Sequence, residues 1–191
     1  LQAVTGRRLT RTRLRDAIQE SSSARREYRR LFNLQATAPA GLYGTDVLLA
    51  VNACGHESVA SWVAAMRTLN DEIEARKEDG TYVGNKRAPR VLLTGSPPIF
   101  PGLKIPLLVE QAGAVIVADE LCSSSRFHYD TVIPGEGTLY DMIPAVADRY
   151  LKPSTCPCFV SNPERKRRLV EMTRRFAAEG IIYQAFSGCH L

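Results

Sequence analysis

Short apolar runs alternate with amphipathic segments over the second half of this chain, and this alternation is the feature that most constrains its fold. A strand that alternates with a helical segment is typical of βαβ units, whose parallel strands form one sheet. We therefore predict an α/β fold with an open parallel sheet of about four strands and flanking helices. The predicted strands are Arg90–Thr94, Ala114–Ala118, Cys158–Val160 and Ile181–Phe186, and the predicted helices are Lys104–Ala112, Tyr140–Tyr150 and Pro163–Glu179.

The first 80 residues are predicted to be helical, as an arm followed by a helix pair, because apolar residues recur at helical spacing among charged ones. Trp62 lies on the apolar side of the last of these helices and is expected to anchor a core. A polar, glycine-containing stretch then separates residues 1–80 from an α/β domain at 88–191. The predicted helices are Thr10–Asn33 with Thr10 as its N-cap, a second from a cap at Thr45 or Asp46 to about Cys54, and a third from Glu57 to about Arg76.

The charge pattern and the apolar runs exclude two classes of partner. Lys and Arg number 25 against 20 Asp and Glu, and much of the excess lies at 7–30 and 165–175. Aromatic residues are too few there to stack on bases, so we expect solvated helix faces and no nucleic-acid partner. No run reaches the roughly 18 apolar residues of a membrane span, and the first residues lack the apolar core of a signal peptide. We expect a cytoplasmic protein without a membrane partner, whose cysteines are not disulfides.

Cysteines lie at or close to the ends of three of the four predicted strands, with Cys156 and Cys158 beside the short strand Cys158–Val160. Ligands of open parallel sheets bind outside the carboxyl ends of the strands. Cys122, Cys156, Cys158 and Cys189 are therefore predicted to share one site, the alternative being that they are buried thiols. The four strand ends carry Gly95–Pro98, Asp119–Cys122, Cys156–Cys158 and Gly188–His190.

Other polar residues near these ends are weaker candidates. Asp119 and Glu120 either fix the turn by accepting backbone hydrogen bonds or take part in proton transfer. His128 and Tyr129 are candidates for acid–base work, with a surface loop as the alternative interpretation. His190 adjoins Cys189 and is either a ligand, a proton donor or an ordinary polar residue.

Thiolates at a strand edge bind soft metals, as tetrahedral zinc or as iron–sulfur clusters. Cys156 and Cys158 are closer than the CxxC pair of a zinc knuckle, and no second pair lies nearby, which argues against a structural zinc module. Cys54 and His56 are interpreted as a buried small residue beside a capping histidine. The sequence has neither a Walker loop nor a GxGxxG motif, so it predicts no nucleotide-binding fingerprint.

Six segments in order resemble the 2-hydroxyacyl-CoA dehydratase and benzoyl-CoA reductase family. The resemblance covers nearly the whole chain, with residues from 90 onward corresponding to the family's last Rossmann-like domain. The segments are Arg90–Ser96 (RVLLTGS), Val117–Arg126 (VADELCSSSR), Asp148–Cys158 (DRYLKPSTCPC), Asn162–Arg168 (NPERKRR), Gly180–Tyr183 (GIIY) and Gly188–Leu191 (GCHL).

The resemblance implies an oxygen-sensitive iron–sulfur enzyme, a dehydratase (lyase) or a reductase, that binds an acyl-CoA or another small molecule. It implies low-potential electrons from an ATP-hydrolysing iron–sulfur activator, and a second subunit or a homodimer partner. Cys189 matches a cluster cysteine of the family. Several dehydratase subunits lack a cysteine at the place of Cys122, and its presence with Cys156 and the GCH ending is more similar to the branch with double-cubane clusters. The implied cofactor is a 4Fe-4S or a double-cubane cluster. Cys158 is a less consistent match, and no catalytic residue is assigned.

The resemblance also predicts that the chain is a C-terminal part of a larger protein. The family's N-terminal domain supplies further cluster cysteines and much of the acyl-CoA pocket. We therefore expect these 191 residues alone to hold no complete cluster and to be inactive. Two alternatives stay open, a non-catalytic binding or scaffold subunit of the same fold and a zinc-dependent or thiol redox domain.

Overall fold

A computed structural model describes residues 2–98, 101–151, 156 and 161–186. Helices dominate the first half of the chain, and strands enter only from residue 90 onward. The elements are α1 (Gln2–Thr5), α2 (Arg11–Ala36), α3 (Gly44–Asn52), the 3-10 helix η1 (Ala53–Gly55), α4 (Val59–Glu78), β1 (Arg90–Gly95), α5 (Lys104–Gln111), β2 (Val115–Glu120), α6 (Ser125–His128), α7 (Leu139–Leu151), α8 (Pro163–Arg175) and β3 (Gly180–Gln184).

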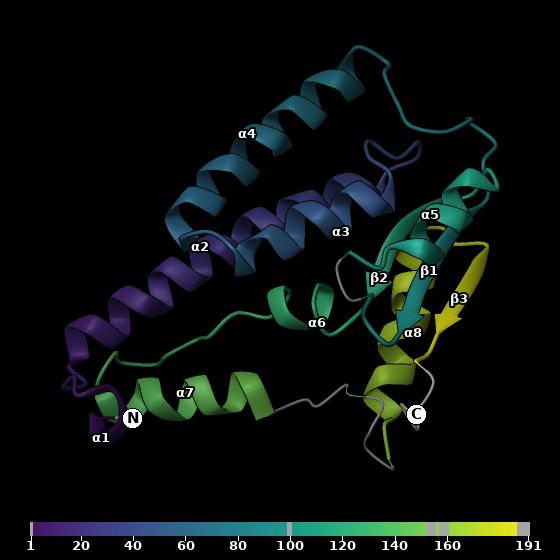
Figure 1. The fold of residues 1–191 in the computed structure, drawn as a ribbon. Coiled ribbons are helices and arrows are strands. Elements are labelled where there is room, and N and C mark those ends of the chain that lie inside the picture. The colour runs from purple at the N-terminus through teal and green to yellow at the C-terminus, as the bar shows by residue number, and fades with distance from the viewer. Residues whose placement is uncertain (1, 99–100, 152–155, 157–160, 187–191) are drawn as a thin grey trace.

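The described strands form one parallel sheet in the order β2-β1-β3. This confirms the α/β class and the parallel sheet, whereas the fourth predicted strand, Cys158–Val160, lies outside the described residues. Because β1 is central, Thr94 is in register with Glu120 on one side and with Tyr183 on the other. The carboxyl ends of the three strands therefore meet at one edge of the sheet (Figure 1).

Helices cover both faces of β1 and β2, which explains why these two strands are nearly continuous apolar runs, whereas Ile181 and Tyr183 of β3 are half exposed. Leu92 enters a cluster with α2, α4 and α8, while its neighbour Leu93 enters a second cluster with α3 and α5. Phe32 of α2 meets Phe176 at the end of α8 edge to face, with ring centroids 4.5 Å apart. The arm and the helix pair thus share a hydrophobic core with the sheet.

The long helices extend away from the sheet (Figure 1). α4 packs along α2, and α7 packs against the first half of α2. Trp62 on α4 is 2% exposed, and its indole Nε1 donates a hydrogen bond to the Ala50 carbonyl at 2.8 Å, so its prediction as a core anchor is confirmed. In the described part of the chain, none of these helices has both the length and the apolar character that crossing a bilayer demands.

Polar side chains begin two of the helices, and the cap at Thr10 confirms the prediction made from the sequence. The Thr10 hydroxyl accepts a hydrogen bond from the Arg13 backbone N–H at 3.3 Å at the start of α2. Asn162 caps α8, where its Oδ1 accepts from the Arg165 N–H at 3.2 Å and Pro163 fills the first helical position. Both caps satisfy backbone donors that the helix leaves unpaired.

The predicted cap of α3 is wrong. Tyr43 occupies the cap position without a side-chain bond, and Thr45 and Asp46 lie inside the first turn. The carboxylate of Glu110 on α5 takes over the role, since it accepts hydrogen bonds from the backbone N–H groups of Gly44 at 2.6 Å and Thr45 at 3.2 Å. A negative charge at a helix N-terminus is favourable, and here it comes from a distant segment.

Two local features also differ from the sequence prediction. α8 ends at Arg175 rather than Glu179, because Phe176 turns into the core and Ala177 adopts a left-handed φ of 46°. The short helix α6 was not predicted, and it follows directly on the turn after β2. This turn and α6 shape the edge of the sheet where the cysteines were expected.

Candidate functional site

The end of β2 places a buried carboxylate, Glu120, between two arginines. Arg126 Nε donates to Glu120 Oε1 at 2.5 Å and Nη2 to Oε2 at 2.6 Å, while Arg165 Nε donates to Oε2 at 3.2 Å. Thr94, in register on β1, donates from Oγ1 to Oε2 at 3.0 Å. Glu120 is 0% exposed. Two guanidinium groups around one carboxylate leave a net positive charge at this edge.

Arg126 connects this network to two of the predicted site cysteines. Its Nη1 donates to Cys122 Sγ at 3.1 Å, and Cys122 is exposed to solvent. Burial lowers the pKa of Arg126, but the hydrogen bond and charge of Glu120 and the charges of Cys122 and Cys156 raise it above its ordinary value. Cys122 and Cys156, far apart in the sequence, therefore act on the same guanidinium.

The start of α8 positions Cys156 and Arg165 together. Asn162 Nδ2 donates to the Cys156 carbonyl at 2.5 Å, while Asn162 Oδ1 caps the helix that carries Arg165. Arg165 in turn binds Glu120 on β2. One asparagine thus holds the backbone of Cys156 against the same network that reaches Cys122.

The remaining predicted ligands, Cys158 and Cys189, lie outside the described residues, as does His190. Within the described ranges, no group of three or more His, Cys, Asp and Glu side chains is placed to hold a metal ion. The part of the edge that can be described supplies two thiols, and a shared site of three or more cysteines stays a prediction.

Asp119 fixes the turn after β2, in agreement with one of the two interpretations of its sequence position. Its Oδ1 accepts from the Leu121 N–H at 3.1 Å, and its Oδ2 accepts from the Ser124 hydroxyl at 2.8 Å. Burial raises the pKa of Asp119 to about 6 although these hydrogen bonds oppose the shift. Glu120 does not bond to the turn backbone in this way, because its oxygens are taken by Thr94 and the arginines.

Several polar atoms at the same edge are buried without a hydrogen-bond partner in the described part of the chain. Gln184 at the end of β3 donates from Nε2 to the Ser96 carbonyl at 2.8 Å, but its Oε1 has no partner. Buried polar groups without partners are rare and costly in folded proteins, which makes each of them a candidate contact for a ligand. The unpartnered atoms at this edge are Ser96 Oγ, Ser123 Oγ, Ser125 Oγ and Gln184 Oε1.

His128 is buried rather than part of a surface loop, so that interpretation is corrected. It lies on α6 and stacks between Tyr28 and Trp62, with ring centroids 5.3 and 5.5 Å away. Desolvation, helped by the charges of Arg25 and Arg149, lowers the pKa of His128 to about 4. The imidazole is therefore neutral at neutral pH. Sequence reasoning missed this position because the three rings come from separate helices.

His128 and Asp119 affect stability with opposite dependence on pH. The folded-state pKa of His128, about 4, lies below its ordinary 6.5, so its contribution to stability is present above pH 6.5 and is lost as pH falls to 4. The folded-state pKa of Asp119, about 6, lies above its ordinary 3.8. The folded protein takes up that proton first, so this group adds stability as pH falls from 6 to 4.

We expect single substitutions to separate these two contributions. As pH falls from 7 to 4, the unfolding free energy of His128→Gln should rise by about 3 kcal/mol relative to that of the parent protein. Over the same fall in pH, the unfolding free energy of Asp119→Asn should drop by about 3 kcal/mol relative to the parent. Denaturant unfolding at both pH values measures these differences. Stability differences that do not change with pH would contradict both assignments.

A cavity of about 450 Å³ lies beside the turn after β2. Its walls come from α2, α3, η1, the start of α4 and the turn that carries Cys122. The cavity is lined by Ala17, Glu20, Ser21, Ala24, Arg25, Val51, Asn52, Cys54, Gly55, Val59, Cys122, Ser123, Phe127 and His128.

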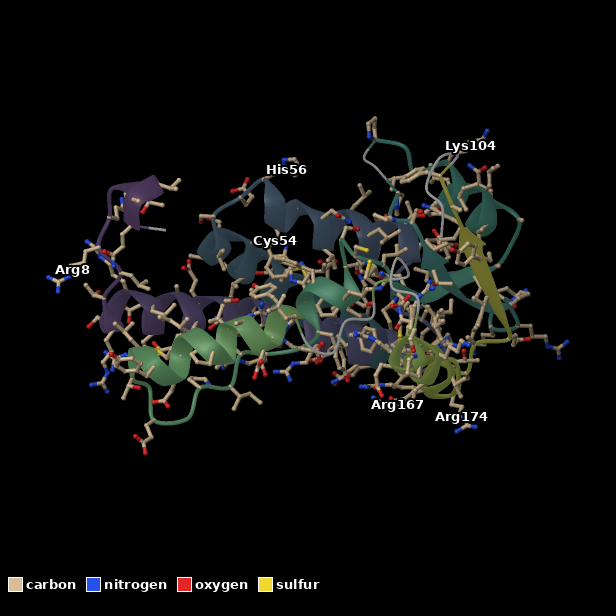
Figure 2. The ribbon with its side chains drawn as sticks, turned by 90° about the horizontal axis from the view of Figure 1, so that it is seen from below. Arg8, Cys54, His56, Lys104, Arg167 and Arg174 are labelled. Atoms are coloured by element: carbon tan, nitrogen blue, oxygen red, sulfur yellow. The ribbon has the colours of Figure 1, made fainter. Side chains whose placement is uncertain are left out.

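Cys54 lines this cavity together with Cys122, a juxtaposition that the sequence analysis missed. Cys54 is partly exposed, and burial raises the pKa of its thiol. His56 is exposed, and Figure 2 shows it at the outer edge of the molecule while Cys54 lies nearer the centre. The two residues therefore do not form a metal pair. No sequence signal links Cys54 to Cys122, because only the packing of η1 against the turn brings them to one cavity.

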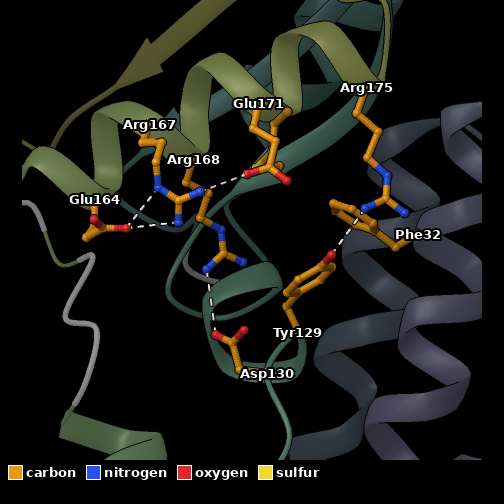
Figure 3. A pocket seen from close by; sticks show the side chains of 9 residues that line it. Phe32, Tyr129, Asp130, Glu164, Arg167, Arg168, Glu171 and Arg175 are labelled. Atoms are coloured by element: carbon orange, nitrogen blue, oxygen red, sulfur yellow. Dashed lines mark hydrogen bonds and ion pairs between the residues drawn. The ribbon is translucent and has the colours of Figure 1, made fainter.

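A second, smaller cavity of about 120 Å³ lies between α8, α2 and the end of α6. Each of its arginines already has a partner, as Figure 3 shows. The contacts of Arg168 and Arg175 fasten α8 to α2 and to the segment after α6, whereas those of Arg167 lie within α8, and we assign all of them a structural role. Arg167 pairs with Glu164 and Glu171, Arg168 with Asp130, and Arg175 donates to the Tyr129 hydroxyl and stacks on Phe32.

Comparison with known proteins now places the chain in a family. A family model described as 2-hydroxyglutaryl-CoA dehydratase, D-component, matches residues 1–191. The chain belongs to this family. It is also 25% identical over 186 residues to the protein of Escherichia coli (strain K12) named "Putative dehydratase subunit YjiM", an alignment that covers 97% of this chain and 47% of that protein. The chain spans about half the length of the curated relative it matches.

Membership of the 2-hydroxyglutaryl-CoA dehydratase D-component family confirms the resemblance found in the sequence. Two of the segments that carried it, Val117–Arg126 and Asp148–Cys158, contain Cys122, which accepts from Arg126, and Cys156, whose carbonyl accepts from Asn162. A third, Asn162–Arg168, supplies the cap of α8 and Arg165. The network around Glu120 therefore joins three segments that the sequence identified separately.

Proposed function

We propose that this chain is part of an iron–sulfur dehydratase or related reductase, and that Cys122 and Cys156 are cluster ligands at the carboxyl edge of its sheet. One observation carries the proposal: Glu120 holds Arg126, which donates to Cys122, and also Arg165, which lies on the helix whose cap, Asn162, donates to the Cys156 carbonyl. Family membership supports the dehydratase class. Cys189 and, less strongly, Cys158 complete the proposed ligand set from the sequence.

The chemistry of the described residues fits a thiolate-bound cluster. Cys122 is exposed and Cys156 is partly exposed, so both sulfurs are within reach of a ligand. Thiolate ligands bring negative charge, and the excess positive charge of Arg126 and Arg165 over Glu120 compensates it. Hydrogen bonds to ligand sulfurs tune such clusters, and Arg126 Nη1 already makes one.

The cluster would supply single-electron transfer to a bound acyl-CoA or another small molecule, and the residues of this chain would set the conditions for it. Glu120 holds Arg126 by accepting hydrogen bonds from its guanidinium. Asn162 holds Cys156 by donating a hydrogen bond to its backbone carbonyl. We assign these groups to positioning and to electrostatic balance rather than to proton transfer.

We also propose that the chain acts with other proteins in the cytoplasm. The family name contains the word component and the relative's name the word subunit, which supports a multi-subunit assembly with a second subunit or a second copy. An ATP-hydrolysing iron–sulfur activator is the proposed electron donor. Because the chain spans about half of its relative, these partners and the substrate belong to the whole protein.

Anaerobic reconstitution of the full-length protein tests the proposal. Cys122→Ser and Cys156→Ser should each lower the iron and sulfide content well below that of the parent protein, since each removes a ligand. Cys54→Ser is the matched control and should retain the iron, because burial raises the pKa of that thiol and disfavours the ligand form.

The possible results separate the candidate functions. Unchanged iron in both Cys122→Ser and Cys156→Ser would contradict the ligand assignment. Stoichiometric zinc in place of iron would favour a zinc-dependent or thiol redox domain. A metal-free protein whose partner binding survives replacement of all five cysteines would favour the scaffold alternative.

A further inference from the structure

Arg25 is a buried cation without an acidic partner in the described structure. Its side chain, on α2, is 2% exposed. Nη1 bonds to the Ser21 hydroxyl, Nη2 donates to the Tyr150 hydroxyl at 3.0 Å, and Nε has no partner. Buried charges in proteins are almost always paired, because removing an ion from water is costly. The guanidinium, which also lies over the Tyr150 ring, therefore has one N–H without an acceptor and no carboxylate counter-charge among the described residues.

Arg25 forms part of the wall of the 450 Å³ cavity beside Cys122. A second unpartnered donor lies in the same wall, since Ser123 Oγ is buried and makes no hydrogen bond to the described residues. Two residues that each carry an unpartnered polar atom, one on α2 and one in the turn after β2, thus line one cavity. An anion with oxygen acceptors would satisfy both of them.

The rest of the wall selects among anions. Most of its other side chains are apolar and short, which leaves room for a hydrocarbon chain but offers few donors for a multiply charged phosphate. His128 is neutral at neutral pH, so it offers no second positive charge that would attract the anion away from Arg25. Glu20, the one acidic lining residue, is exposed at the rim of α2, where solvent screens it. The apolar lining residues are Ala17, Ala24, Val51, Val59 and Phe127.

We propose that this cavity binds a small carboxylic acid, with its carboxylate at Arg25 and Ser123 and its hydrocarbon chain along the apolar wall toward Cys122. Charge-assisted bonds from a guanidinium to a carboxylate are among the strongest in proteins, and Arg25 itself is buried, so little water competes for its N–H groups. Because it assigns a substrate class to the site of Cys122, this inference rests on the proposed function. The binding itself involves no cluster.

Titration of the full chain, metal-free, with butyrate and with its uncharged isostere butyramide tests this proposal. Butyrate should bind at least about tenfold more tightly than butyramide, because only the carboxylate provides the missing charge. Inorganic phosphate should bind more weakly than butyrate. Equal binding of butyrate and butyramide would overturn the proposal, and tighter binding of phosphate would overturn the ligand class.

Substitutions locate the binding in this cavity. Arg25→Gln should weaken butyrate binding about tenfold or more, and Ser123→Ala a few-fold. Arg26→Gln, which removes the same charge from the exposed neighbour on α2, is the matched control and should leave binding unchanged. If Arg25→Gln does not fold, Arg25→Lys and Ser123→Ala still decide, since full butyrate affinity in both variants would overturn the assignment.

The same experiment distinguishes this inference from the proposed function. A protein that assembles its cluster but binds butyrate and butyramide alike retains the proposed function and loses the carboxylate site. A protein that prefers butyrate yet never incorporates iron retains the carboxylate site and loses the cluster. Each result therefore contradicts one of the two proposals and leaves the other intact.

Discussion

The Glu120→Gln variant is expected to lose about 3 to 5 kcal/mol of unfolding free energy, because removal of one partner of a buried ion pair leaves the other charge uncompensated. The two arginines that would lose their carboxylate are themselves mostly buried, with side chains 8% exposed for Arg126 and 15% exposed for Arg165. A neutral amide still accepts hydrogen bonds but cannot balance two guanidinium charges. Denaturant unfolding near neutral pH measures the loss.

Glu72→Gln is the matched control for this prediction. Glu72 pairs with Arg76 on the surface of α4, where both side chains are 51% exposed. Solvent-exposed pairs of this kind contribute less than about 1 kcal/mol. Similar losses of unfolding free energy for Glu72→Gln and Glu120→Gln would show that burial does not increase the contribution of the Glu120 network to stability.

The Gly95→Ala variant should lose about 3 to 5 kcal/mol, from backbone strain and steric overlap together. Gly95 ends β1 with φ of 106°, a conformation that favours glycine. An added Cβ would lie 2.0 Å from the Gln184 carbonyl oxygen, the atom that accepts the Ser96 N–H at 2.8 Å. The substitution therefore forces β3 away from β1 at the edge that carries the site. Thermal and denaturant unfolding measure the effect.

Gly113→Ala separates strain from overlap. Gly113 has a similar φ of 95°, but no atom lies within 4 Å of the position of its Cβ. Only the left-handed backbone is then penalised, at about 1 to 2 kcal/mol. If Gly95→Ala loses no more unfolding free energy than Gly113→Ala, β3 does not approach Gly95 as closely as described.

The strands β1 and β2 could be predicted from the sequence because their burial on both faces leaves a continuous apolar run. Val115–Glu120 is buried at every position, and the run that predicted it differs from the strand by one or two residues at each end. The caps at Thr10 and Asn162 were predictable for a similar reason. A capping side chain and the backbone N–H that donates to it are three residues apart in the sequence, so the information needed to predict the cap is local.

Contacts between distant segments could not be predicted in this way. Nothing near Thr45 indicates that Glu110 would cap α3, and the rings around His128 come from α2 and α4. Likewise, Cys54 gave no sequence signal of a shared cavity with Cys122. Each of these contacts depends on how helices pack on the sheet, which residue spacing within one segment does not contain.

The candidate site lies between these two cases. The rule that ligands bind at the carboxyl ends of parallel strands placed Cys122 and Cys156 at one edge, and both act on Arg126 there. The same rule gave no role to Arg126 or Arg165, since arginines are common on exposed helix faces. Their role follows only from the burial of Glu120 between them.

Protection of individual thiols from alkylation tests the central claim most directly. The full-length protein would be alkylated before and after anaerobic reconstitution, and each cysteine would be followed by mass spectrometry. We expect Cys122 and Cys156 to react in the metal-free protein and to become protected together as iron is incorporated, because both are cluster ligands beside Arg126. An iron-loaded protein in which Cys122 and Cys156 remain fully reactive would contradict the account.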